Sequence, residues 1–300
     1  MEIRAADGGL LVINELPVED YVRGVAPLEL GDVRESDTSA MQAQAIAARS
    51  YVYVRLDDPD NLRRPYDVVA TVSDQVYGGE SAETRVGDEA VASTAGQVLA
   101  YGGRVVNAPY FAACGGSTAA SSEVWKSSDV PYLRPVSDQV PGTSDRYYCD
   151  GSSKFRWTRT FSKAELSAVL NKYLRHYAAA GTFGREVGGV RSVAAESLTP
   201  SGRVGELAIT TDAATYRVRG NDIRFVFRAP NGEILNSTYF AIEQTVGPDG
   251  RIAALTLRGN GNGHGVGMCQ AGAIGRARAG QDYRAILQTY YPGTVIATVG

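Results

Sequence analysis

The sequence lacks long apolar runs and any excess of positive charge. No stretch of about 18 apolar residues occurs, so we expect no transmembrane helix. Residues 1–20 also lack the basic start and the apolar core of a signal peptide. The formal net charge of -3 over 300 residues gives no basic footprint, which argues against nucleic acid as a partner. The chain is therefore either cytoplasmic or the part of a protein that follows an export segment.

Cysteine, histidine and lysine are all scarce. The three cysteines (Cys114, Cys149, Cys269) show no CxxC spacing, and their odd number fits either one disulfide plus a free thiol or a metal site. Of the two histidines, His176 lies within a helical pattern and is expected at the surface, so His264 is the unusual one. Four lysines stand against 17 tyrosines. A tyrosine-rich surface suits sugars or peptides, and a tyrosine-rich β core is the equal alternative.

The composition and the pattern predict an α+β fold with a largely antiparallel sheet, because 44% of the residues are apolar and no regular βαβ alternation or repeat occurs. Helices are predicted over 18–26, where Pro27 would end the helix, and over 40–56, 83–94, 162–180, 268–279 and 282–291. Strands are predicted within 1–16 and over 66–77, 190–200, 204–211, 215–218 and 252–257, with a hairpin at Gly102-Gly103 and a helical turn over 221–227.

The segment 21–53 is the most informative part of the chain. A single carboxyl group, Glu29, lies among apolar neighbours in the sequence GVAPLEL, and an alanine-rich helix over 40–56 follows. Small side chains allow another backbone or a long polymer to lie close to that helix. A carboxyl group in apolar surroundings holds its proton toward neutral pH, which suits a general acid. This pairing indicates an enzyme.

Two further segments could carry chemistry. In the segment RGNGNGHGVGMCQAGA, glycines alternate around His264 and free the backbone for close approach to a partner, or simply form a tight loop against the core. The spacing does not fit a dinucleotide site. In the segment YFAACGGSTAASSEVW, Ser117 and Thr118 follow a Gly-Gly turn after Cys114, without the GxSxG pattern of serine hydrolases. A Cys114–His264 nucleophile pair is the main enzymatic rival, against a purely structural thiol.

The motifs INELPVEDYVRGVAPLEL, MQAQAIAARSYV, ACGGSTAASSEVW and GNGHGVGMCQAGAIGRARAGQDYRAILQTYYPGT occur in the same order as in a known family. In these motifs the chain resembles the SpoIID sporulation proteins and the related LytB amidase enhancers over nearly its whole length. The resemblance implies a peptidoglycan lytic transglycosylase. Such an enzyme cuts glycan strands that have lost their stem peptides and leaves 1,6-anhydro-muramoyl ends. The alternative is a wall-binding amidase enhancer that cleaves nothing.

The resemblance also implies site residues. The catalytic glutamate of the family maps onto Glu29, which would act as both general acid and general base. The expected glycan contacts are Gln44, Arg49, Ser117, Thr118, His264 and Gln270. Each of them has a structural alternative; Arg49, for example, could pair with Glu15 or Asp20 instead.

No cofactor is expected, with zinc as the alternative. Some relatives bind zinc through Cys and His near the segment that matches Cys114, but no His lies within 110–125, so that site is not reproduced. A metal site from Cys114, Cys149, Cys269 and His264 is conceivable. A Cys114–Cys149 disulfide, with Cys269 buried and free, is favoured at least as much.

For the domain organisation, we expect a catalytic core from 1–150 and 251–300, and a second lobe, 151–250, that walls a long groove beside the alanine-rich helix. The expected partners are peptidoglycan glycan strands and an N-acetylmuramoyl-L-alanine amidase. The expected location is outside the cytoplasm, at the cell wall or at the membrane through a segment absent from this chain.

Overall fold

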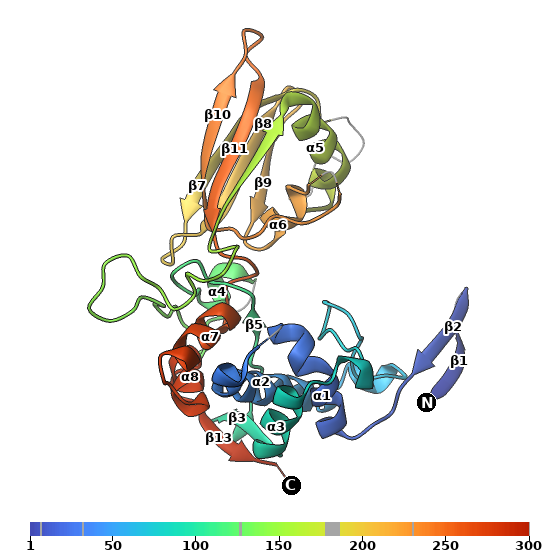
Figure 1. Cartoon of the computed structure of the whole chain (residues 1–300). Coiled ribbons are helices and arrows are strands. Elements are labelled where there is room, and N and C mark those ends of the chain that lie inside the picture. The colour runs from blue at the N-terminus through green and yellow to red at the C-terminus, as the bar shows by residue number, and fades with distance from the viewer. Residues whose placement is uncertain (7, 32, 126–127, 178–186, 230, 300) are drawn as a thin grey trace. The chain divides into compact units, whose positions relative to one another are not determined.

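The computed structural model describes residues 1–6, 8–31, 33–125, 128–177, 187–229 and 231–299 (Figure 1). Its packing divides the chain into two compact units. Met1–Tyr110 and Ala273–Gly300 form one, here called the helical unit, and Phe111–Gly272 forms the other, the sheet unit. Both units are α+β and their strands pair almost entirely antiparallel, which confirms the predicted fold class.

The centre of the helical unit is the alanine-rich helix α2 (Thr38–Leu56). It packs against α1 (Val18–Leu30), α3 (Arg85–Ser93), α8 (Tyr283–Tyr290) and strand β3 (Gln97–Tyr101) (Figure 1). All its side chains from Ala43 to Ser50 are buried. The small alanine side chains therefore serve close packing with the unit's own helices.

The strands of the helical unit form two small antiparallel sheets. β1 (Glu2–Ala6) and β2 (Gly9–Ile13) form the predicted opening hairpin. β3 pairs with β4 (Arg104–Val105) across the Gly102-Gly103 turn and with β13 (Val295–Thr298) on its other side. Short 3₁₀ turns lie at Glu35–Asp37, Asn61–Arg63 and Glu80–Ala82.

Two predictions for the helical unit are wrong. The segment 66–77 is not a strand, because side chains satisfy its backbone instead of a ladder: Asn61 donates to the Asp67 carbonyl at 2.9 Å, and the Asp74 carboxylate accepts from the Val69 N–H at 2.9 Å. Pro27 does not end α1, which continues to Leu30. The turn after Pro27 still closes, since the Gly31 N–H donates to the Pro27 carbonyl at 2.9 Å.

The sheet unit is built from two three-stranded antiparallel sheets around one apolar core. One has the order β10 (Phe240–Val246), β11 (Ile252–Asn260), β6 (Arg156–Ser162), and the other the order β7 (Val190–Leu198), β8 (Val204–Thr211), β9 (Thr215–Arg219). The helices α5 (Lys163–Tyr177) and α6 (Asp222–Val226) complete the core (Figure 1). The sequence pattern missed β6 and β10. Residues 178–180 of the predicted helix lie outside the described residues.

The remaining elements are short: β5 (Tyr110–Phe111), α4 (Ser121–Val124), β12 (Met268–Cys269) and α7 (Gln270–Arg278). Residues 111–150 belong to the sheet unit, because Ala113 exchanges two backbone hydrogen bonds with Asn262 (2.9 and 2.7 Å) and the Ala119 N–H donates to the Gly265 carbonyl at 2.8 Å. The division at 150 and 251 therefore differs from the one in the structure. That two lobes enclose a long groove remains a prediction.

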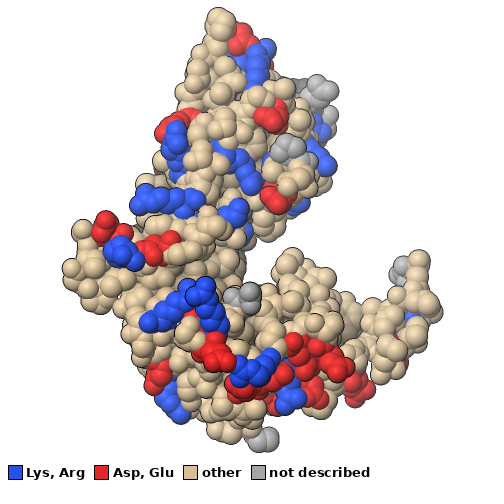
Figure 2. Space-filling view, viewed as in Figure 1, with Lys and Arg blue, Asp and Glu red and all other residues tan. Residues whose placement is uncertain are grey.

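Charged side chains of both signs are interspersed on the face that Figure 2 shows, where Lys and Arg gather only in small separate groups. Exposed ion pairs such as Arg85–Glu89, at 2.8 Å, contribute little to stability. Within the described ranges, no helix has both the length and the apolar character needed to cross a membrane.

Candidate active site around Glu29

Glu29 lies in the last turn of α1, half-buried. Its Oε1 accepts a hydrogen bond from the backbone N–H of Val76 at 2.7 Å. Burial raises the pKa of Glu29, and the Val76 hydrogen bond opposes that rise. Of its two leucine neighbours in the sequence, Leu30 is buried, whereas Leu28 is 45% exposed. The carboxyl group is thus in an environment that favours its protonated form.

A glycine allows the segment 75–79 to reach Glu29. The Gly78 N–H donates to the Gly24 carbonyl of α1 at 3.1 Å. A Cβ at Gly24 would lie only 2.6 Å from the ring of Tyr77. Because real Cβ atoms do not approach that closely, only glycine at position 24 lets this segment lie directly on the helix.

The charge of Glu29 acts on two nearby tyrosines, Tyr21 and Tyr110. Tyr21 donates to Gln75 Oε1 at 3.2 Å, and Gln75 Nε2 donates to the hydroxyl of Tyr110 at 2.8 Å. Burial raises the pKa of Tyr21 and of Tyr110, and the negative charge of Glu29 contributes to both shifts. Both phenols are therefore neutral at physiological pH. The site combines one titratable acid with neutral hydrogen-bonding groups.

A cavity of about 460 Å³ lies in the same unit. Tyr21 and Tyr77 line it, and their rings stack at 5.3 Å between centroids. The rest of its lining comes from Glu2 of β1, from β2, and from the segments 14–16 and 65–70. Sequence reasoning did not single out these residues. The only signal was the abundance of tyrosine, which had two equal interpretations.

Two predicted glycan contacts in the helical unit, Gln44 and Arg49, have no exposed surface. Arg49 forms a bidentate ion pair with Glu19 (2.9 and 2.7 Å) and donates to the Gln97 carbonyl at 3.0 Å. The prediction of glycan contact is therefore wrong for both side chains. The alternative of an internal ion pair holds for Arg49, with Glu19 in place of Glu15 or Asp20.

The other predicted contacts lie in the sheet unit or at its end. Thr118 is fully buried, accepts from the Val136 N–H at 2.8 Å and has a structural role, and Gln270 is only 7% exposed. Ser117 and His264 keep part of their surface. The His264 ring lies 5.3 Å from Phe111 and 5.2 Å from Trp125, and its Nδ1 accepts from the Val266 N–H at 3.1 Å.

The glycine-rich loop is a tight, packed loop. Gly261 has φ +77°, and a Cβ there would lie 2.6 Å from the Ala113 carbonyl oxygen. Gly115 has φ +71°, and a Cβ there would lie 2.6 Å from the backbone of Asn260. The loop and the Gly115-Gly116 turn thus contact each other backbone to backbone, which confirms the structural interpretation of these glycines.

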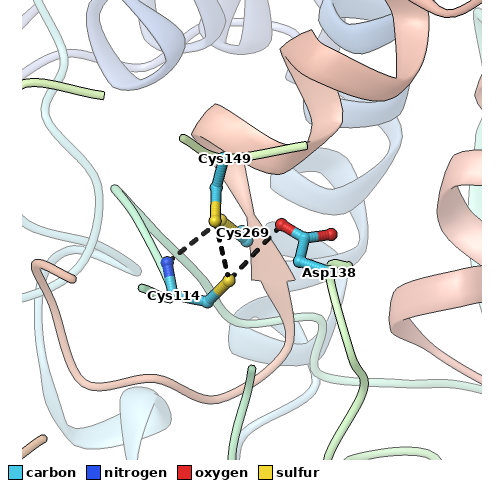
Figure 3. Close-up of side chains that lie close together, drawn as sticks. All are labelled: Cys114, Asp138, Cys149 and Cys269. Carbon is cyan, nitrogen blue, oxygen red and sulfur yellow. Dashed lines mark hydrogen bonds between the residues drawn. The ribbon is translucent and has the colours of Figure 1, made fainter. Parts of the chain in front are cut away.

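The three cysteines meet in the sheet unit, together with Asp138 (Figure 3). Cys114 Sγ lies 3.3 Å from Cys149 Sγ and 3.3 Å from Asp138 Oδ2. All three thiols are free and buried, so the predicted Cys114–Cys149 disulfide is absent, and Asp138 takes the place expected for His264. Hydrogen bonds from Cys114 and Cys269 lower the pKa of Cys149 to about 3, whereas burial raises the pKa of Cys114. A raised pKa and full burial make Cys114 unsuitable as a nucleophile.

Comparison with known proteins places these sites in a family. The family model of the stage II sporulation protein, SpoIID, matches residues 6–101. An uncharacterized protein of Brachyspira hyodysenteriae is 32% identical over 289 residues, which cover 96% of this chain and 68% of that protein. The stage II sporulation protein D of Bacillus subtilis is 29% identical over 298 residues, or 95% of this chain and 76% of its own length.

The chain belongs to the SpoIID family.

The amidase enhancer of Bacillus subtilis is also similar, at 30% identity over 92% of this chain, but the chain spans only 40% of that protein's length. The SpoIID model covers Glu29, Val76 and the tyrosines Tyr21 and Tyr77. A model of a domain of unknown function, DUF8618, matches residues 143–267, which include Cys149 and His264. The SpoIID match therefore covers Glu29 and most of the residues around it, although Tyr110 and the cysteine cluster fall outside the match.

Proposed function

We propose that this SpoIID-family chain is a lytic transglycosylase that cleaves peptide-stripped glycan strands of peptidoglycan. The observation that carries the proposal is the half-buried Glu29, whose pKa is raised by burial and which is positioned by the Val76 N–H. A carboxyl group that stays protonated toward neutral pH can donate a proton to a leaving group. Relatives named stage II sporulation protein D support the substrate class.

The reaction uses Glu29 twice. In the first step, protonated Glu29 gives its proton to the glycosidic oxygen, and the bond from that oxygen to the muramoyl C1 breaks. In the second step, the Glu29 carboxylate accepts the proton of the C6 hydroxyl of the same sugar, and the C6 oxygen bonds to C1. The products are a free 4-hydroxyl end and a 1,6-anhydro-muramoyl end, and Glu29 regains its proton.

A single acid is sufficient for this chemistry. Hydrolytic glycosidases place two carboxyl groups across the bond, because the second one either activates a water molecule or attacks the sugar to form a covalent intermediate that water then cleaves. Here the sugar's own hydroxyl replaces water. The charge of another acid, Asp74, also acts on Tyr21, but its carboxylate already accepts from the Tyr51 hydroxyl at 2.5 Å and from the Val69 N–H. Glu29 is therefore the acid we assign to proton transfer.

The test is a product assay on glycan strands from which an amidase has removed the peptides. Mass spectrometry should detect 1,6-anhydro-muramoyl ends with the unaltered chain. Glu29→Gln should reduce their rate of formation at least about 100-fold, because general acid–base assistance contributes about 10²–10⁴-fold. Glu89→Gln, the same change at an exposed glutamate of α3, is the matched control and should retain full activity. A folded Glu29→Gln protein that forms the products at the normal rate rules out the assignment.

The similarity to an amidase enhancer favours one second candidate, a wall-binding protein that stimulates an amidase and cleaves nothing. The two candidates differ in their response to Glu29→Gln. An enhancer would stimulate amidase release of stem peptides equally well with either side chain, and no anhydro ends would form. Both functions act on the cell wall, so we place the protein outside the cytoplasm, which fractionation of the native cells checks.

A further inference from the structure

We propose a structural zinc site in the sheet unit, with four ligands: Cys114, Asp138, Cys149 and Cys269. All four side chains are buried, and their ligand atoms lie within 4.8 Å of one another. The site is independent of Glu29 and of the proposed reaction. It joins segments of the chain that are up to 155 residues apart.

The donor set and its spacing fit a tetrahedral ion. Zinc in structural sites binds four ligands, mostly thiolates, with Zn–S near 2.3 Å and Zn–O near 2.1 Å, so two sulfur ligands lie roughly 3.8 Å apart. Cys114 Sγ lies 3.3 Å from Cys149 Sγ and 3.3 Å from Asp138 Oδ2 (Figure 3). Shifts of about half an ångström open this cluster around one ion. The same sulfur–sulfur distance is far longer than the roughly 2.05 Å of a disulfide.

Backbone N–H groups already point at one of the sulfur atoms. Cys269 Sγ accepts from the Cys114 N–H at 3.1 Å and from the Gly272 N–H at 3.3 Å. Hydrogen bonds of this kind orient metal ligands and stabilise the deprotonated sulfur. Thiolate is the form in which cysteine binds zinc.

A buried cation lies beside the cluster. Three thiolates and one carboxylate carry four negative charges against the two positive charges of zinc. The Arg203 side chain is 3% exposed, and its Nη2 donates to the Cys114 carbonyl at 3.3 Å and to the Ser117 carbonyl at 2.8 Å. Arg203 has no ion pair among the described residues, so its positive charge faces the cluster without a carboxylate partner in that part of the chain. Arg203 thus offsets part of the charge of the loaded site.

A disulfide explains the cluster less well than a metal ion does. A Cys114–Cys149 bond would use only two of the four side chains that converge here, and would not involve Cys269 or Asp138. A metal ion uses all four groups at once. It would also hold Cys269, at the end of the glycine-rich loop, against the Cys114 turn, and so position His264.

The experiment measures metal content. The full chain is expressed in medium with zinc, purified without chelators under a non-thiol reductant, and analysed by plasma mass spectrometry. We expect about one zinc per chain. Replacing zinc with Co²⁺ should give the sulfur-to-metal charge-transfer absorption of tetrahedral thiolate ligation.

Two variants and one control assign the ligands. Asp138→Asn and Cys149→Ser should each lower zinc affinity by at least about tenfold, because even indirect partners of a metal contribute that much. Asp145→Asn, an exposed acid of the same unit, should bind zinc normally. Asp138→Asn keeps all three thiols and tests the site even if Cys149→Ser fails to fold. The proposal is overturned if the folded chain carries no metal, or if it carries iron in place of zinc. It is also overturned if the chain contains a Cys114–Cys149 disulfide, or if the Asp138→Asn and Asp145→Asn variants bind zinc equally well.

Discussion

Glu29 lies in an environment that favours its neutral form, and such an environment reduces the stability of the folded protein when the carboxyl group is ionised. In the unfolded chain the carboxyl group is solvated and has an ordinary pKa. In the folded chain burial raises the pKa of Glu29, so ionisation destabilises the native state. A catalytic acid that is poised in this way commonly reduces stability in exchange for activity.

The first prediction follows from the upward direction of the Glu29 pKa shift. Because the folded pKa is raised, the contribution of Glu29 to stability is full below its unfolded pKa and is lost as pH rises through the folded value. Glu29→Gln has no charge to lose. Thermal melting followed by circular dichroism should show the variant more stable than the unaltered chain at pH 8, with the difference disappearing near pH 4. A variant that is less stable at pH 8 would show that Glu29 is not held toward its neutral form.

A second residue, Asp37, shows the opposite shift. Its carboxylate is fully buried and accepts two hydrogen bonds from Arg278, at 2.7 and 2.8 Å, which lower the pKa of Asp37. This contribution to stability is present above the unfolded pKa and is lost as pH falls. Arg278→Ala should lower the free energy of unfolding by about 1–3 kcal/mol at pH 7 and by much less near pH 3.

Urea titrations at the two pH values measure that difference. Arg104→Ala is the matched control, because Arg104 is exposed on β4. It should change the free energy of unfolding by less than about 0.5 kcal/mol at both pH values. An equal loss for Arg278→Ala at both pH values would contradict the proposed ion-pair effect.

At the scale of elements, the contact between α1 and the segment 75–79 decides the geometry around Glu29. Alanine normally stabilises a helix relative to glycine by about 1 kcal/mol. At Gly24 the new Cβ would lie 2.6 Å from the Tyr77 ring. This ring stacks on Tyr21, and its hydroxyl accepts a hydrogen bond from Asn14 Nδ2 at 3.2 Å. A ring held in this way cannot move without losing those contacts. The clash therefore outweighs the gain in helix propensity.

We predict that Gly24→Ala destabilises the protein by about 1–3 kcal/mol, as overpacking usually does. Denaturant unfolding measures the loss. Gly9→Ala on the opening hairpin is the control, because no atom lies within 4 Å of its added Cβ. If Gly24→Ala stabilises the chain, the segment 75–79 does not lie where the structure places it.

Elements whose hydrogen bonds join residues close in sequence were easier to predict than elements whose partners are distant. Helices with a clear apolar face, such as α5, and hairpins at Gly-Gly turns were predicted well, because their bonds are local. The segment 66–77 alternates like a strand, but its backbone bonds to the side chains of Asn61, outside the segment, and Asp74, within it. An alternating pattern does not reveal either contact. Proline was expected to end α1 because it removes one backbone hydrogen bond. Pro27 nevertheless lies within the helix, because the burial of α1 as a whole outweighs the loss of that one bond.

The candidate sites were predictable to different degrees for the same reason. Glu29 was recognised from its apolar neighbours and its family motif, both of which are local in sequence. The cysteine cluster depends on packing between distant segments, and Asp138 carries no motif of its own. Arg49 and Thr118 were predicted to contact glycan but are buried. The sequence alone does not show whether a polar side chain faces water or an internal partner.

At the scale of the whole molecule, the zinc site lies entirely within the sheet unit. Removal of the metal should therefore affect the two units unequally. We predict that a strong chelator increases amide hydrogen exchange in residues 111–150 and 259–272, while the buried part of α2 exchanges as slowly as before. Exchange followed by mass spectrometry measures both regions in one sample. A uniform increase over the chain would indicate global unfolding rather than loss of a local cross-link.

The backbone contact between Gly115 and Gly261 limits how this surface can diversify. Neither position has room for a methyl group, so the two loops must keep their present path in any functional descendant. Sequence change on this surface would then fall on the neighbouring side chains that keep some exposure, Ser117, Asn262 and His264. The paired glycines thus fix the backbone path of both loops, while these three side chains can vary without displacing it.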